Sequence, residues 1–167
     1  MTSKQPPLIV ADTSILVSIL KKEEHRVAAS QAFLEGHGGS HLVVLPAVAE
    51  LELFAEADLR HASSIIREER QAASRRIESY LNSQRFVSGD LSPRAVRFAR
   101  VRIADLNIRF ADAAIVGTAL ALNAIAVYTW DDKLIRACSD LEGIEVTNPP
   151  APESASETPP LFDAPTP

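Results

Sequence analysis

Four acidic residues stand at positions where α/β proteins commonly place ligand-binding groups. Asp12 directly follows the first apolar run of the chain, and Asp131 comes just after a later one. Asp112 begins a segment of small apolar residues, and Glu50 lies about one helical turn beyond a third apolar run. If these runs are parallel strands, residues at their carboxyl ends meet at one edge of the sheet. The sequence therefore predicts a cluster of four carboxylates.

Each of these acids also has a purely structural explanation. The three aspartates can cap helices, and the glutamate can be an exposed residue of an amphipathic helix. Together, however, four neighbouring carboxylates would repel one another. A divalent cation relieves that repulsion, and Mg²⁺ or Mn²⁺ prefers oxygen ligands. The four histidines and the lone Cys138 follow no zinc-ligand spacing, so a carboxylate-bound Mg²⁺ or Mn²⁺ is the metal that the pattern favours.

A basic stretch in the middle of the chain suggests what such a metal would act on. The net charge is −5, yet eleven arginines and only five acidic residues lie between Arg60 and Arg109. Basic side chains beside a metal favour phosphate-ester chemistry, in which the metal activates water and no protein nucleophile is required. Candidate substrate-binding residues are Arg67, Arg70 and Arg109. The alternative is that these arginines form solvated helix faces with local partners.

Apolar runs alternate with helical patterns along the chain, which predicts parallel pairing through crossover helices. We expect an α/β fold: a three-layer α/β/α sandwich around a central, mostly parallel sheet of four or five strands. The predicted strands are residues 8–11, 41–45, 125–129 and 144–146, with 86–87 as a short strand or linker. The predicted helices are residues 15–20, 23–35, 46–55 (with Pro46 in the first turn), 58–82, 92–106, 111–122 and 132–138.

The length of 167 residues and a hydrophobic content of 46% predict one globular domain over residues 1–149. From residue 148 to the end, seven of twenty residues are proline, so residues 150–167 are expected to form a flexible tail. A single cysteine allows no intrachain disulfide, which favours a reducing, cytoplasmic setting. No apolar run is long enough for a membrane span.

The acidic motifs, in this order and spacing, resemble those of PIN domains over about residues 8–149. The motifs are VADTSIL at residues 10–16, VAEL at 48–51, ADAAIVGTAL at 111–120 and YTWDDKL at 128–134. The segment GIEV at residues 143–146, followed by Asn-Pro, also resembles the close of these domains. Each motif alone is weak, but four in the right order are fairly specific.

The resemblance implies a Mg²⁺- or Mn²⁺-dependent endoribonuclease of the kind found as the toxin in VapBC toxin–antitoxin modules. It implies that the catalytic, metal-binding acids are Asp12, Glu50, Asp112 and Asp131. Asp132 could share or replace the role of Asp131, but Asp131 is the acid that completes the Thr-x-Asp pattern of the family. Asp132 is better placed to meet the positive end of the helix that follows.

The same resemblance implies roles for two hydroxyl groups and for partner molecules. Ser14 and Thr129 would orient carboxylates or metal-bound water from the second shell of ligands, with helix capping or turn bonding as the alternative. Toxins of this type pair with a small antitoxin that covers the active-site groove, and they form homodimers. The expected partners are therefore an RNA substrate, an antitoxin and a second copy of the chain, with no membrane.

Other classes of function fit the sequence less well. A phosphatase of the haloacid-dehalogenase type needs a second aspartate two residues after Asp12, where Ser14 stands. A PIN fold that binds RNA or protein without cutting remains the main alternative. A third possibility is an interaction protein that acts through its arginine-rich helices and its tail.

Overall fold

The computed structural model describes residues 5–55, 75, 78–83 and 86–152. Most of the helix predicted over residues 58–82 lies outside these residues, although residues 78–83 are helical. Arg67 and Arg70 also lie outside the described residues, as does the proline-rich tail from residue 153 onward. The predictions made for those positions stay predictions.

Five parallel strands form one sheet in the order β3-β2-β1-β4-β5. The strands are β1 (Leu8–Ala11), β2 (Leu42–Pro46), β3 (Val87–Gly89), β4 (Ala126–Tyr128) and β5 (Glu145–Thr147). In the central strand, Val10 pairs with Val44 on one side and with Val127 on the other. The predicted parallel sheet is confirmed, and the segment near residue 87, predicted as a short strand or linker, is one of its two edge strands.

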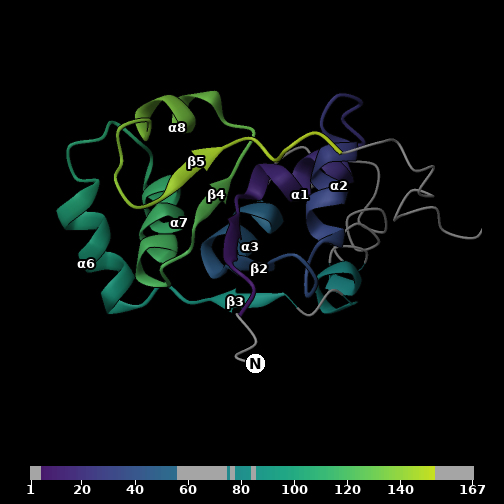
Figure 1. Ribbon diagram of the computed structural model, residues 1–167, viewed down its shortest axis with the longest axis horizontal. Helices are drawn as coiled ribbons and strands as arrows, with labels where there is room; N and C mark the ends of the chain where they lie inside the picture. Colours follow the sequence, from purple (N-terminus) through teal and green to yellow (C-terminus); the bar gives the residue numbers. More distant parts are fainter. Residues whose placement is uncertain (1–4, 56–74, 76–77, 84–85, 153–167) are drawn as a thin grey trace, which may run out of the picture.

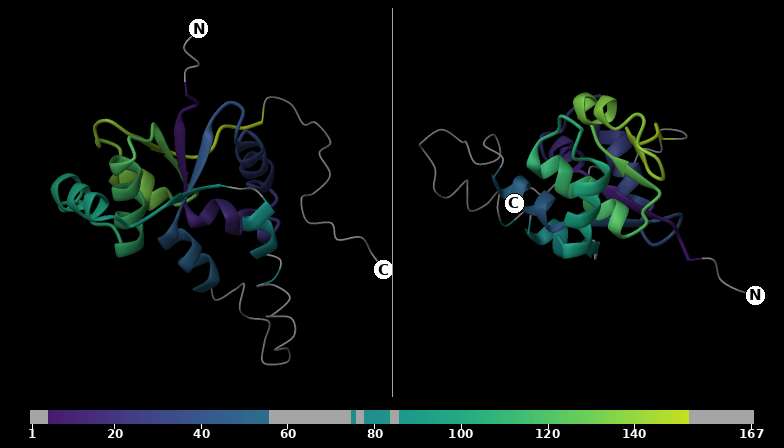
Figure 2. Two further views of the ribbon diagram at one scale, coloured as in Figure 1. Left: turned by 90° about the horizontal axis from the view of Figure 1, so that it is seen from below. Right: turned by 90° about the vertical axis from the view of Figure 1, so that its left-hand side faces the viewer.

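Helices flank the sheet on both sides and complete the three-layer α/β/α sandwich that the sequence predicts (Figure 1). They are α1 (Thr13–Leu20), α2 (Val27–Glu35), α3 (Ala47–Ala55), α6 (Pro93–Arg102), α7 (Phe110–Ala121) and α8 (Asp132–Ala137). In Figures 1 and 2, α1 and α2 lie on one side of β1, and α6 and α7 lie on the other. Among the described helices, none has the length and apolarity to cross a membrane.

Most element boundaries differ from those predicted by one or a few residues, and three of the differences have a visible structural setting. Helix α2 begins at Val27 rather than near residue 23, because the backbone N–H of Arg26 closes a turn on the carbonyl of Glu23. Pro46 ends β2, opposite Gly89 of β3, instead of lying in the first turn of α3. Helix α6 ends at Arg102 rather than near residue 106. None of these differences moves a predicted acid to another element.

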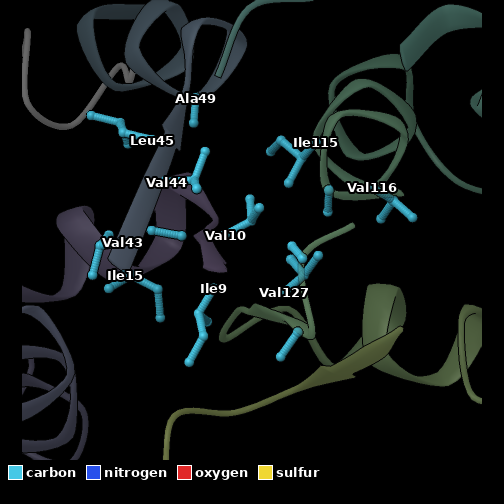
Figure 3. Close-up of a cluster of buried hydrophobic side chains, with 14 of the residues drawn as sticks. Ile9, Val10, Ile15, Val43, Val44, Leu45, Ala49, Ile115, Val116 and Val127 are labelled. Atoms are coloured by element: carbon cyan, nitrogen blue, oxygen red, sulfur yellow. The ribbon is translucent and has the colours of Figure 1, made fainter. Parts of the chain in front are cut away.

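The strands are buried on both faces, which explains their continuous apolar runs. Successive side chains of a strand point to opposite faces, and Ile9, Val10, Val43 and Val44 are all buried. Figure 3 shows these side chains in one cluster with residues of α1, α3 and α7, including Ile115. A parallel sheet covered on both faces requires this composition, so the apolar runs of the sequence specify central strands.

Gly117 sets how closely α6 approaches α7, the helix that carries Asp112. A Cβ atom at this glycine would lie 2.7 Å from the carbonyl oxygen of Ala95 and 3.0 Å from Cβ of Ala99. The first of these atoms belongs to the backbone of α6, so it cannot move without displacing the helix. The absence of a side chain at residue 117 is therefore required for this packing.

We expect Gly117→Val to destabilise the fold by roughly 2 kcal/mol, because the larger side chain overpacks the contact between α6 and α7. Urea unfolding followed by circular dichroism measures the change. Gly39→Ala is the matched control, since a Cβ there meets only one atom, at 3.6 Å. Equal stabilities of the two variants would show that the contact is not close.

Candidate active site

Asp12 directly follows β1 and caps α1 at the carboxyl edge of the sheet. Its backbone N–H donates to the carbonyl of Tyr128 on β4, 3.0 Å away. Its Oδ2 accepts hydrogen bonds from Ser14 N (3.3 Å), Ser14 Oγ (2.5 Å) and Thr129 Oγ1 (2.7 Å). The side chain of Asp12 is therefore held by the first turn of α1 and by the residue that follows β4.

The Asp12 carboxylate is buried, with the whole residue only 6% exposed. Burial raises its pKa; the hydrogen bonds from Ser14 and Thr129 oppose this rise, and the charge of Asp112 adds to it. All three hydrogen bonds reach Oδ2, and no donor among the described residues reaches Oδ1. Asp12 thus lines the cleft with one carboxylate oxygen, Oδ1, that accepts no hydrogen bond from the described residues.

Thr129 links Asp12 to Asp131. Its fully buried hydroxyl donates to Asp12 and accepts from the backbone N–H of Asp131 at 3.0 Å. The hydroxyl of Ser14 makes a parallel link, because it accepts from the backbone N–H of Trp130 at 2.9 Å. The two hydroxyls predicted from sequence therefore lie where they fix the orientation of Asp12 relative to the loop after β4.

The side chain of Trp130 is held in turn by the hydroxyl of a buried serine. Its indole Nε1–H donates to Ser30 Oγ of α2 at 2.8 Å, and Ser30 shares a hydrogen bond of 2.7 Å with Ser18 of α1. Arg26 lies over the indole ring, 5.5 Å from its centroid. The loop that carries Asp131 is thereby tied to α1 and α2.

Arg109 joins the other two aspartates. Its Nε and Nη2 donate to the two oxygens of Asp112 at 3.0 and 3.2 Å, and Nη2 also donates to Oδ2 of Asp131 at 3.0 Å. The hydrogen bond to Asp112 and the charge of that residue raise the pKa of Arg109. Oδ1 of Asp131 caps α8 by accepting from Lys133 N (2.8 Å) and Leu134 N (3.3 Å).

These residues border a cleft of about 410 Å³. It is lined by Asp12, Thr13, Ser14, Val17, Glu52, Ala55, Arg109 and Asp131. Asp112 is buried beneath Arg109, at 5% exposure, and connects with the cleft through that guanidinium. The structure thus brings together three of the four predicted acids, Asp12, Asp112 and Asp131, whereas Asp132 is exposed and does not line the cleft.

Glu50 does not join these aspartates, contrary to the sequence prediction. It lines a separate depression with Phe54 and Phe86, among others. The reason is helical geometry: Ala49 and Leu53 of α3 point into the core, and neighbouring side chains of a helix differ in direction by about 100°. Glu50 therefore lies on one flank of the buried face and Glu52 on the other.

Glu52 is the glutamate that the fold turns toward the cleft, and sequence reasoning missed it. Its Oε2 accepts a hydrogen bond of 2.7 Å from Thr13 Oγ1. Burial raises the pKa of Glu52, the Thr13 hydrogen bond opposes this rise, and the charges of Asp12 and Asp112 add to it. The sequence signal was the pair of acids on either side of Leu51, of which only one can face the cleft.

The donor groups of the cleft fit a hard divalent cation. They are carboxylate and hydroxyl oxygens, which Mg²⁺ and Mn²⁺ prefer, and the buried Asp12 retains an oxygen without a donor. As they stand, however, no three acidic, histidine or cysteine residues of the described segments are grouped closely enough to hold an ion. Arg109, predicted as a substrate contact, lines the cleft and lies between Asp112 and Asp131.

Comparison with known proteins agrees with this architecture. Residues 9–139 match the family model described as PIN domain, and the chain belongs to that family. No curated protein matches it.

Several solved structures share the fold. A chain from the crystal structure of VapBC2 from Rickettsia felis, bound to a DNA fragment from their promoter, has a TM-score of 0.65 at 16% identity, covering 84% of this chain and 98% of that one. A chain of VapBC-1 from nontypeable Haemophilus influenzae has a TM-score of 0.61 at 16% identity, covering 84% and 97%. A chain of FitAcB from Neisseria gonorrhoeae has a TM-score of 0.58 at 24% identity, with the same coverage.

We expect Asp12→Asn to stabilise the metal-free protein at pH 7. The pKa of Asp12 is raised in the folded state, so protonation of this side chain favours folding. This contribution to stability is lost as the pH rises, and at pH 7 the ionised carboxylate lowers the free energy of unfolding. The amide oxygen can still accept from Ser14 and Thr129. We expect a gain of about 1 kcal/mol, measured by urea unfolding in the presence of a chelator.

The stabilisation should shrink below the ordinary aspartate pKa of 3.8, where the parent is also neutral at this position. Asp140→Asn, at an exposed aspartate, is the control and should change little. A less stable Asp12→Asn variant would mean that the hydrogen bonds to Asp12 outweigh its burial.

Proposed function

We propose that this PIN-domain protein is a Mg²⁺- or Mn²⁺-dependent endoribonuclease that hydrolyses RNA phosphodiester bonds. The observation that carries the proposal is the meeting of Asp12, Asp112 and Asp131 at one edge of the sheet, although they lie far apart in sequence. Burying like charges together is unfavourable. A bound cation would offset this repulsion, so the clustering of the three aspartates supports a cation-binding site.

Three aspartates would hold the metal in this proposal, and the two hydroxyls would orient them. When bound, such a cation lowers the pKa of a water molecule and stabilises the leaving oxygen of the phosphodiester. Thr129 and Ser14 fix the Asp12 carboxylate through Oδ2, which leaves Oδ1 for the ligand. Arg109 is the described basic side chain nearest the cleft and would contact the phosphate; Arg67 and Arg70 are further candidates.

We further propose that the chain is the toxin of a type II toxin–antitoxin pair. The fold neighbours are chains of VapBC2, VapBC-1 and FitAcB, and the family match covers most of the chain. By analogy, the partners are a small antitoxin that covers the cleft and a second copy of the chain, in the cytoplasm. The alternative, a PIN-fold module that binds RNA or protein without cutting, predicts binding without hydrolysis.

We expect Asp12→Asn to abolish Mn²⁺-dependent cleavage of a fluorescently labelled RNA, because the substitution removes a charged metal ligand. Thr129→Val should reduce the rate about 10–100-fold, the usual effect of losing a group that orients a ligand. Asp140→Asn should cleave like the parent. Equal rates for Asp12→Asn and the parent would refute the assignment, and RNA binding without cleavage by the parent would favour the non-catalytic alternative.

The fourth carboxylate can be identified by comparing two substitutions on α3. The family motif aligns with Glu50, whereas the geometry favours Glu52, and we propose that Glu52 serves the cleft. We expect Glu52→Gln to reduce cleavage at least about tenfold, the lower range for a group supporting a metal site, and to weaken Mn²⁺ binding. Glu50→Gln should have the smaller effect in both assays, and the reverse order would restore the assignment from the motif.

A further inference from the structure

Arg109 occupies a position between acids that belong to different elements. Its guanidinium binds Asp112 at the start of α7 and Asp131 at the end of the loop after β4. Its backbone N–H also donates to Asp112 Oδ2 at 3.3 Å. Among the described residues, Arg109 supplies every hydrogen bond that the Asp112 carboxylate accepts, so one cation compensates two acids.

The two sides of this ion pair differ in burial. The Asp112 side chain is 7% exposed, whereas the Arg109 side chain is 71% exposed. The guanidinium can therefore leave toward solvent by side-chain rotation, while the carboxylates stay fixed by their elements. An exposed arginine also retains most of its hydration, which keeps the cost of such a movement low.

We propose that the guanidinium of Arg109 neutralises Asp112 and Asp131 when no metal is bound, and that a divalent metal must displace this guanidinium in order to bind. This inference rests on the proposed metal site and adds a residue that sets the metal affinity. The same carboxylate lone pairs cannot serve both an arginine fork and a small cation, so the two compete. Displacement would also release the guanidinium toward the cleft, where the substrate phosphate would lie.

The test is Mn²⁺ binding to the full chain by isothermal titration calorimetry, comparing the parent with Arg109→Gln and Lys133→Gln. Lys133 is exposed and lies two residues after Asp131 in the sequence, so its substitution removes the same charge nearby without removing an observed side-chain contact to the acids. We expect Arg109→Gln to tighten Mn²⁺ binding about tenfold, as charge-assisted hydrogen bonds no longer compete. Lys133→Gln should tighten it much less.

A second measurement uses the parent protein and does not depend on how a variant folds. In ¹⁵N NMR spectra, the Nε–H resonance of Arg109 should shift as Mg²⁺ is added, because the hydrogen bond to Asp112 is broken. An unchanged resonance at saturating Mg²⁺ would overturn the inference.

The calorimetric outcomes separate this inference from the proposed function. If the parent and Arg109→Gln bind Mn²⁺ equally, or if both substitutions tighten binding equally, the metal site stands and the competition is refuted. Weaker binding by Arg109→Gln also refutes it and would make Arg109 a positioning residue for the ligands. If neither protein binds Mn²⁺, the metal site itself is wrong and the inference falls with it.

Discussion

Repulsion between carboxylates at the carboxyl edge of the sheet is the constraint that organises this molecule. Asp12 and Asp112 are both buried, and the charge of Asp112 contributes to the raised pKa of Asp12. A fold selected for stability alone would not place them there. Two interactions reduce this repulsion. Hydroxyl groups donate hydrogen bonds to Asp12, and the Arg109 guanidinium lies between Asp112 and Asp131.

The rigid parts of the fold lie where this constraint requires them. Asp12 is held by a central strand paired on both sides, and Asp112 belongs to a helix packed against α6 without room for a side chain at Gly117. The loop with Asp131 is tied down through Trp130 and the serines beneath it. Packing and hydrogen bonds in the neighbouring elements thus offset the unfavourable free energy of the clustered carboxylates.

The fold and the state of its carboxylate cluster are separate properties of this PIN domain. The family match covers residues 9–139, which include the three aspartates and, apart from Leu8, the first four strands of the sheet. The proposed nuclease chemistry depends on whether the acids take up a cation in place of Arg109. A non-catalytic relative could retain the same sheet and the same hydroxyl network, so the state of the carboxylate cluster separates the two possibilities.

The sequence alone determined the sheet, the layers and the three aspartates. Continuous apolar runs specify strands buried on both faces, and acids directly after such strands, or at the start of a following helix, reach one edge whatever the loops between them do. Only the tertiary structure decided which of Glu50 and Glu52 faces the cleft, because the rotation of α3 depends on which of its residues pack into the core. It also decided the role of Arg109, since the pairing with Asp131 joins residues 22 positions apart. Side-chain direction on a helix and pairing across elements are set by long-range packing, which no local pattern in the sequence records.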